Sequence, residues 1–420
     1  MSQWQTIRLG SACEKIGSGA TPRGGSEVYQ ATGISLIRSQ NIYNDGFKRD
    51  GLAFIGDKHA RELENVNVLP GDVLLNITGD SVARVCQVPE KILPARVNQH
   101  VAIIRPKQGT LDARFLHYFL IHPQTQAHML GLAGAGATRN ALTKGMIESF
   151  EIKAPSFTEQ RAIAAVLGSL DDKIELNRRM NETLEALAQS LFKSWFVDAT
   201  QSALPKGWET KSLAEVTELI TKGTTPTQED VASAPISDAQ INFLRVNAIA
   251  EDGVILDEKL TKIPESVHTG VLKRSILKAG EVVYTIAGTI GRMSVVRENL
   301  LPVNCNQAVA IIRPKLDVPP GFLLLSMKQT AFQEELHSNI VHAVQANLSL
   351  GMLSRAKIAV PPKESFGRLF QPINDLLEKI DANREESRSL AALRDALLPK
   401  LLSGELRVPA TAGKLAEAHA

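Results

Sequence analysis

The sequence predicts an α+β protein with two similar globular units and two long helices that pair as an antiparallel coiled coil. Three observations support this fold class. Blocks of sequence recur about 205 residues apart. Short β-branched runs bounded by Gly, Pro and Asn are typical of strands. Two long stretches carry apolar residues at alternating spacings of four and three, the pattern of a coiled-coil seam.

The duplication is visible in blocks that keep the same order in both halves of the chain. The block 98–107, NQHVAIIRPK, returns 208 residues later as NQAVAIIRPK. Several collinear blocks at nearly constant offset indicate an internal repeat rather than chance. The other matched blocks are 9–22 with 213–226, 70–79 with 279–288, and 152–155 with 358–361.

Each copy divides into a globular part and a helix. Runs such as VLLNI and VVYTI predict strands, whereas 111–130 predicts one or two helices, so the globular part is α+β. The 420 residues are enough for several domains at about 150 residues each. The predicted boundaries are 1–155 and 201–364 for the globular domains, 156–200 for a central helix, 365–408 for a C-terminal helix, and 409–420 for a tail.

The first long helix is predicted to open at Ser156, with Glu159 completing a capping box, and to run to about Phe196. Neither apolar seam is expected to be covered by its own small domain, so the two helices should bury each other. Asn177 and Asn383 place a polar residue near the centre of each seam, where it would set the register. The predicted seam residues are Leu167, Leu170, Ile174, Asn177, Leu184, Leu191, Ile373, Leu376, Ile380, Asn383, Leu390 and Leu397.

Composition and missing motifs exclude several function classes. The net charge is only +2, and three scattered cysteines suit neither a disulfide framework nor a four-ligand zinc site. The chain has no apolar run long enough for a membrane span, and its opening lacks the apolar core of a signal peptide. No phosphate-binding loop, catalytic triad or metal spacing occurs. We therefore expect a soluble, cytoplasmic protein with no catalytic residues and no metal site.

The repeated motifs resemble those of the specificity subunits of type I restriction-modification enzymes. They are Gly-x-Thr-Pro at 19–22 and 223–226, the Gly-Asp/Glu-Val strands, the Asn-Gln blocks, and LFKSWFVDA (191–199) leading to LPKGW (204–208). The resemblance covers the chain up to about Pro409. One departure is that LLPKLLSGEL replaces LFKSWFV in the second copy, so the two helix ends are not equivalent.

This resemblance implies two target-recognition domains, each reading one half of a split double-stranded DNA site, with the helices acting as a ruler. It also implies two modification subunits that methylate adenine and, in the full enzyme, ATP-driven restriction subunits. S-adenosylmethionine, ATP and Mg would then bind to those partners rather than to this chain. The first globular unit is mildly basic, with 17 Lys or Arg against 13 Asp or Glu over residues 1–158, which is compatible with DNA.

Base readout requires polar side chains on loops, with Arg suited to guanine and Asn or Gln to adenine. Residues that differ between the copies are favoured for specificity, because the two halves should read different bases. The candidates are Thr21, Arg23, Arg38, Gln40, Asn41, Thr78, Arg84, Arg139 and Asn140 in the first unit, and Thr225, Arg245, Asn247, Thr289, Arg292, Gln345 and Asn347 in the second.

Shared polar residues have competing interpretations. Asn98-Gln99 and Asn306-Gln307 occur in both copies, which favours a structural role. Arg105 and Arg313 fit either phosphate contacts or a solvated strand end. For the whole chain, two other functions stay open: a DNA-processing enzyme, disfavoured by the missing motifs, and a protein scaffold that holds partners without reading bases.

Overall fold

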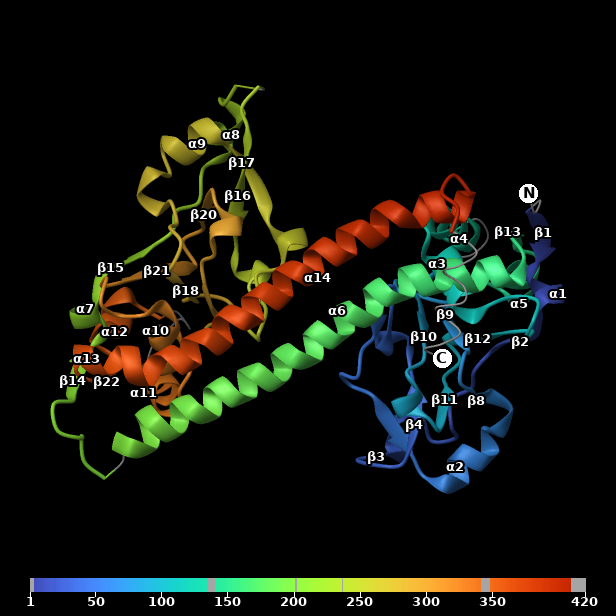
Figure 1. Cartoon of the computed structure of the whole chain (residues 1–420), viewed down its shortest axis with the longest axis horizontal. Helices are drawn as coiled ribbons and strands as arrows, with labels where there is room; N and C mark the ends of the chain where they lie inside the picture. Colours follow the sequence, from blue (N-terminus) through green and yellow to red (C-terminus); the bar gives the residue numbers. More distant parts are fainter. Residues whose placement is uncertain (1–3, 135–139, 201, 236, 341–347, 409–420) are drawn as a thin grey trace. The chain divides into compact units, whose positions relative to one another are not determined.

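The computed structural model describes residues 4–134, 140–200, 202–235, 237–340 and 348–408 (Figure 1). The chain forms two compact units, each of which contains one repeat's globular part and portions of both long helices. Unit 1 comprises residues 1–177 and 384–420, and unit 2 comprises residues 178–383. The two long helices are α6 (Phe157–Phe192) and α14 (Gln371–Ser403). No helix among the described residues is both long and apolar enough to cross a membrane.

The globular part of unit 1 is built on two sheets. An antiparallel sheet has the order β10-β9-β12-β2, and a mixed sheet has the order β3-β7-β4-β11-β8, with β11 parallel to β4. The apolar runs predicted as strands form the centre of the antiparallel sheet, since β9 and β12 are buried along most of their length. The strands of these sheets are β2 (Cys13–Ser18), β9 (Val73–Asn76), β10 (Val85–Gln87), β12 (Val101–Pro106), β3 (Tyr29–Gln30), β7 (Ala53–Ile55), β4 (Ile34–Ile37), β11 (Ala95–Val97) and β8 (Asn67–Val68).

Short elements complete unit 1. Two further strand pairs join β1 to β13 and β5 to β6, and the predicted helical stretch forms α3 and α4. Asp112 begins α3 by accepting hydrogen bonds from two backbone amides of its first turn. The remaining elements are β1 (Gln5–Arg8), β13 (Glu151–Ala154), β5 (Ile42–Tyr43), β6 (Gly46–Phe47), α1 (Leu9–Ala12), α2 (Asp57–Glu62), α3 (Ala113–Ile121), α4 (Pro123–Gly134) and α5 (Lys144–Glu148).

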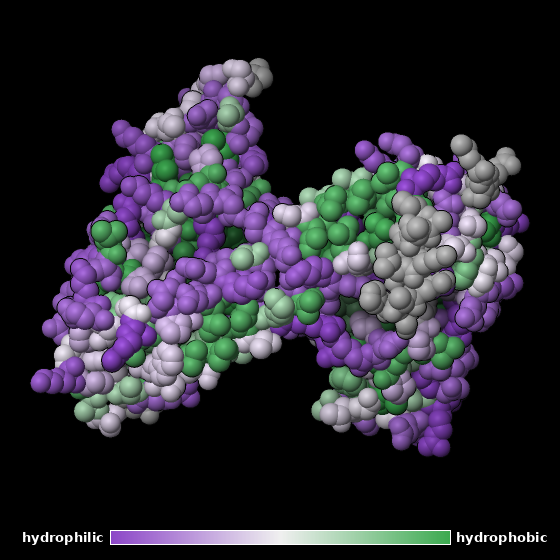
Figure 2. Space-filling view, viewed as in Figure 1, coloured by the Kyte–Doolittle hydropathy of each residue, from purple (hydrophilic) through white to green (hydrophobic). Residues whose placement is uncertain are grey.

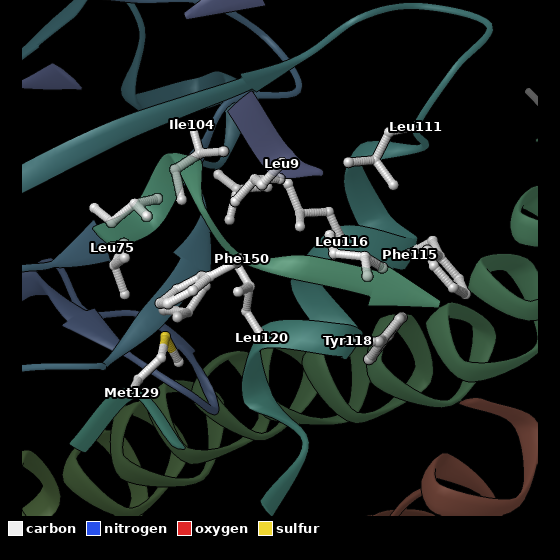
Figure 3. Close-up of a cluster of buried hydrophobic side chains, with 14 of the residues drawn as sticks. Leu9, Leu75, Ile104, Leu111, Phe115, Leu116, Tyr118, Leu120, Met129 and Phe150 are labelled. Carbon is white, nitrogen blue, oxygen red and sulfur yellow. The ribbon is translucent and has the colours of Figure 1, made fainter. Parts of the chain in front are cut away.

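One core of unit 1 lies between the antiparallel sheet and the helices. Phe115, Leu116 and Tyr118 from α3 pack with strand residues Leu75 and Ile104 (Figure 3). The same cluster includes Ile163 and Leu167 of α6 and Leu398 and Leu401 of α14. The long helices are therefore part of the folded core of this unit.

Unit 2 repeats the antiparallel sheet and the terminal strand pair of unit 1, but within the described residues its second sheet has three strands where that of unit 1 has five. Its antiparallel sheet has the order β15-β21-β18-β19, its second sheet the order β17-β16-β20, and β14 pairs with β22. As in unit 1, the second sheet contains one parallel pair, β16 with β20. Its strands are β14 (Glu209–Ser212), β15 (Thr217–Lys222), β16 (Gln240–Leu244), β17 (Thr261–Pro264), β18 (Val282–Thr285), β19 (Met293–Val295), β20 (Val303–Cys305), β21 (Val309–Pro314) and β22 (Lys357–Val360).

The helices of unit 2 meet the long helices through an aromatic cluster. Phe192 and Phe196 stack with ring centroids 4.8 Å apart, and both rings contact Phe322 of α10. Phe366 and Phe370 also contact the Phe322 ring, and Phe370 contacts Phe196 as well. The short helices of this unit are α7 (Leu213–Val216), α8 (Gln228–Ala232), α9 (Glu265–Thr269), α10 (Pro320–Met327), α11 (Thr330–Ile340), α12 (Leu350–Arg355) and α13 (Lys363–Ser365).

The long helices pair antiparallel within each unit, as the sequence predicts. In unit 1, Asp171 of α6 accepts a 2.7 Å hydrogen bond from Arg394 of α14, and Lys173 forms an ion pair with Glu386. The partner number falls from 394 to 386 as the α6 number rises from 171 to 173, which defines the antiparallel direction. All twelve predicted seam residues are buried or half-buried. The antiparallel coiled-coil prediction is confirmed.

The helix ends differ slightly from the prediction. Ser156 Oγ accepts a 3.4 Å hydrogen bond from the Glu159 amide, so Ser156 caps α6 as expected. At its other end the α-helix stops at Phe192, and a π-helical turn, Lys193–Val197, replaces the predicted last turn. A matching π-helical turn, Phe366–Phe370, precedes α14. Both turns contribute rings to the aromatic cluster around Phe322, namely Phe196 from the first and Phe366 and Phe370 from the second.

Candidate nucleic-acid interface

In unit 1, the loops that leave one edge of the two sheets are hydrogen-bonded to one another. The amide of Gly19, just after β2, donates to the Val101 carbonyl over 2.9 Å, and the amide of Asn98, after β11, donates to the Ile37 carbonyl over 3.0 Å. The side-chain amide of Asn76 donates to the Ser39 carbonyl over 2.9 Å. These bonds fix the loops into a single surface, which we call edge 1.

Edge 1 collects the sequence-predicted residues of the first unit that the structure describes. The amide of Gly79 donates to the Asn140 carbonyl, which brings the late loop beside the β9–β10 loop. Arg139 lies outside the described residues. The predicted residues on edge 1 are Thr21 and Arg23 after β2, Arg38, Gln40 and Asn41 after β4, Thr78 and Arg84 between β9 and β10, and Asn140.

Burial separates these residues by role. Thr21, Arg23, Gln40 and Asn140 are exposed on edge 1. Asn41 is fully buried, and its amide donates to the carbonyl oxygens of residues 48 and 50. A buried amide with both hydrogens used stabilises the loop. The predicted base contact through Asn41 would require the loop to open.

A chain of side-chain hydrogen bonds runs along edge 1. Thr21 donates to Gln99, the Nε2 atoms of Gln99 and His100 lie 3.1 Å apart, and His100 Nδ1 lies 2.6 Å from Thr78 Oγ1. The predicted structural role of Gln99 agrees with this chain. His100 is absent from the predicted list, although a signal exists: the repeat replaces it with Ala308 in an otherwise identical block.

Unit 2 builds the equivalent edge, which we call edge 2, from the equivalent bonds. The amide of Gly223 donates to the Val309 carbonyl over 3.0 Å, and the amide of Asn306 donates to the Leu244 carbonyl over 3.1 Å. Thr225 donates to Gln307, as Thr21 does to Gln99. Gln345 and Asn347 lie outside the described residues. The predicted residues on edge 2 are Thr225, Arg245, Asn247, Thr289 and Arg292.

An ion pair with a buried carboxylate lies in each antiparallel sheet, at the end of the strands opposite to the edge. The guanidinium of Arg105 donates to both carboxylate oxygens of Asp72, at 2.7 and 2.8 Å, and Asp72 has no exposed surface. This hydrogen bond raises the pKa of Arg105 above its ordinary value. Arg313 pairs with Glu281 at the equivalent place, with Nε and Nη2 both on Oε1 of the carboxylate. Both arginines are therefore ion-paired rather than merely solvated at a strand end, and the phosphate-contact interpretation stays a prediction.

The described residues contain no group of three His, Cys, Asp or Glu side chains that could hold a metal ion. Burial raises the pKa of the Cys13 and Cys86 thiols to about 12, so neither thiol is a ready nucleophile. The polar groups that converge on edges 1 and 2 are guanidinium, amide, hydroxyl and imidazole groups, all of which form hydrogen bonds. Their chemistry suits recognition.

Comparisons with known proteins agree with the repeat and the fold. Residues 1–186 and 205–392 each match the type I restriction modification DNA specificity domain. The chain is 26% identical over 412 residues to the type I restriction enzyme MjaIX specificity subunit of Methanocaldococcus jannaschii, covering 94% of this chain and 91% of that one. It is 24% identical over 478 residues to the HindI specificity subunit of Haemophilus influenzae, covering 97% and 100% respectively.

The fold is also that of a solved relative. The crystal structure of the S subunit of a type I restriction-modification system from M. genitalium superposes with a TM-score of 0.60 at 15% identity, covering 95% of this chain and 96% of that one. The repeat, the paired helices and the two domain matches lead to one assignment. The chain belongs to the family of specificity subunits of type I restriction-modification systems.

Proposed function

We propose that this chain is the DNA-reading, non-catalytic subunit of its complex, and that each globular unit reads one half of a bipartite DNA target. The observation that carries the proposal is the presence of edges 1 and 2, two surfaces built by equivalent hydrogen bonds but carrying different side chains. Two loop surfaces with the same backbone arrangement suit the same kind of ligand, while their different side chains suit different DNA sequences.

The side chains on each edge match the chemistry of base pairs in the major groove. Arginine forms two hydrogen bonds to guanine, glutamine and asparagine pair with adenine, and the threonine methyl contacts thymine. Edge 1 offers Thr21, Gln40 and Arg84, and edge 2 offers Thr225, Arg245 and Asn247. All six side chains are exposed or half-buried, so a base edge can approach them.

The paired helices have a separate proposed role: they set the unread spacer and dock the partner subunits. α6 is one continuous helix that contributes to both units. Exposed leucines lie along the helices, with Leu176 at 50%, Leu187 at 45% and Leu393 at 48% exposure. Figure 2 shows apolar patches over both helices. Exposed apolar area of this kind marks protein contacts.

The docked partners are proposed to be two modification subunits that methylate adenine, together with restriction subunits that cleave DNA. These subunits would hold S-adenosylmethionine, ATP and Mg. The alternative is a protein scaffold without base readout, which the same apolar patches would serve. The two edges favour base reading, because a scaffold alone has no use for two sets of differing polar loops.

The test is to purify the full chain with its modification subunits and to map the adenines that the complex methylates. We expect a two-part motif with an unread spacer. Replacing residues 1–155 by the equivalent segment of a relative should change one half of the motif, and replacing 201–364 should change the other half. Methylation without any motif would support the scaffold alternative, and a change in both halves at once would contradict the two-reader proposal.

A further inference from the structure

Each unit carries two arginines at equivalent places on its edge. Arg38 in unit 1 and Arg245 in unit 2 directly follow β4 and β16 and precede a 3₁₀ turn. Arg84 and Arg292 directly precede β10 and β19. Their carbonyl oxygens accept 2.8 Å hydrogen bonds from the amides of Asn76 and Thr285 respectively. The backbones thus offer the same two positions for a guanidinium in both units.

In unit 1, the first arginine, Arg38, is hydrogen-bonded within its own loop region. Arg38 donates from Nη2 to the Gly51 carbonyl and lies over the Tyr29 ring, 5.4 Å from its centroid. The guanidinium of Arg84 instead lies over the ring of Tyr43, 4.5 Å from its centroid. Among the described residues of this unit, that guanidinium makes no hydrogen bond and no ion pair.

In unit 2, the second arginine rather than the first is hydrogen-bonded to the backbone. Arg292 donates from Nη1 to the Ile249 carbonyl over 2.9 Å, so the loop itself uses the second arginine. Arg245 is exposed and lies 5.8 Å from the centroid of the Phe243 ring. Its guanidinium likewise has no hydrogen-bond or ion-pair partner within the described part of unit 2.

One sequence difference lies beside the second arginine. The segment IRSQNIYNDG (37–46) aligns with LRVNAIAEDG (244–253), which places Ala250 where unit 1 has Tyr43. The Tyr43 ring supports the face of Arg84 through a cation–π contact. Without a ring at that place, Arg292 reaches the backbone carbonyl of Ile249 instead.

We propose that Arg84 reads a guanine in the half-site of unit 1, that Arg245 reads a guanine in the half-site of unit 2, and that Arg38 and Arg292 shape their loops. Tyr43 is then a positioning residue for Arg84. This inference rests on the proposed function. A guanidinium that stacks on an aromatic ring keeps its in-plane N–H donors for the two acceptors of a guanine edge. A guanidinium bonded to a backbone carbonyl has already used one of these N–H donors.

The test measures binding of the full chain with its modification subunits to its mapped motif, to that motif with single bases changed, and to random duplex. Arg84→Ala should weaken specific binding about 5- to 150-fold and relax the preference for guanine at one position of the first half-site. Arg245→Ala should do the same in the second half-site. Arg38→Ala and Arg292→Ala should lower the melting temperature while the base preferences stay.

Tyr43 supplies a matched pair of variants. Tyr43→Ala should weaken guanine discrimination in the first half-site only, and Tyr43→Phe, which keeps the ring, should restore it. A structural defect alone would lower the melting temperature without changing a single base preference.

Three results would overturn the inference. Equal losses on motif and random duplex would assign Arg84 and Arg245 to phosphates. Relaxed base preference in Arg38→Ala or Arg292→Ala, with Arg84→Ala and Arg245→Ala unaffected, would reverse the assignment while leaving the proposed function intact. A wild-type complex that prefers no sequence would overturn the proposed function and this inference together.

Discussion

The side-chain amide of Asn383 on α14 donates a 2.8 Å hydrogen bond to the side-chain oxygen of Asn181 on α6. Asn181 in turn donates to the Ile380 carbonyl over 3.3 Å. The equivalent pair in unit 1 is Asn177 and Ser387, in which the side-chain amide of Asn177 donates to the Ser387 hydroxyl oxygen over 3.3 Å. Polar contacts thus occur at matched places in both halves of the seam, where they disfavour a shifted register.

The first prediction concerns this asparagine pair. Asn383→Leu alone should destabilise the chain by about 1–3 kcal/mol, because it removes the donor to a half-buried amide oxygen. Asn181→Leu together with Asn383→Leu should cost less than the sum of the single changes, since two leucines can pack in the seam. Thermal unfolding of the full chain and its three variants measures this coupling.

The same variants test the proposed ruler. The complex with the double leucine variant should methylate sites with altered spacers, because the hydrogen bond that disfavours a shifted helix register is removed. Deleting one heptad from each helix shortens each by about 10 Å at 1.5 Å per residue and should favour a shorter spacer. A panel of targets differing only in spacer length reads out both effects. An unchanged single optimum spacer in both variants would reject the ruler.

The second prediction concerns the buried ion pairs. Asp72→Ala should destabilise unit 1 by about 3–5 kcal/mol, because Arg105 would lose its partner in a largely buried place. Glu281→Ala should act alike on Arg313 in unit 2. The measurement is the melting temperature of each variant. A matched surface control is Lys144→Ala, which removes an exposed ion pair to Glu148 and should cost under about 1 kcal/mol.

The third prediction concerns the glycine that opens each edge. A Cβ at Gly19 would overlap the carbonyl oxygens of Val97 and Asn98, and one at Gly223 would overlap those of Cys305 and Asn306. Gly19→Ala should therefore displace the loop after β2 and abolish reading of the first half-site. Gly17→Ala, two residues earlier, meets no atom within 4 Å and serves as the control. Equal motif selectivity in both variants would show that edge 1 does not need this approach.

The fourth prediction is a pH dependence through His117 of α3. Burial lowers the pKa of His117 to about 4, with Arg114 and Arg394 lowering it further and Asp171 opposing them. Between about pH 6.5 and 4 the unfolded chain binds a proton that the folded chain does not. Stability is therefore complete above the unfolded pKa and falls as the pH drops through this window, by about 3 kcal/mol in total.

His117→Leu should remove that part of the pH dependence. The melting temperature of wild type and variant, recorded at pH 7 and pH 5, gives the comparison. The wild type should lose more stability than the variant on acidification, because only the wild type carries the histidine. Parallel losses in the two proteins would show that other groups cause the acid sensitivity.

Much of the architecture follows from sequence periodicity alone. The repeat, the strand-rich globular parts and the seam from Leu167 to Leu397 are local or periodic features, and hydrophobic burial enforces them once the chain folds. The positions of Asn177 and Asn383 at matched places in two helices were enough to predict an antiparallel pairing. The same information placed Thr21, Arg38 and Arg84 on loops that follow or precede strands.

Tertiary structure decided which of those loop residues are available. Asn41 and Gln40 are neighbours in sequence, yet one is buried and the other exposed, because a 3₁₀ turn points them in different directions. From the sequence, Arg105 is a charged residue near the end of a strand. In the structure, Asp72 beside the adjacent strand forms an ion pair with it. Arg38 and Arg292 form hydrogen bonds within the protein because other segments of the chain place the Gly51 and Ile249 carbonyl oxygens beside them. Hydrogen-bond partners far apart in the chain, rather than residue type, therefore determine which polar groups on each edge are left to meet a ligand.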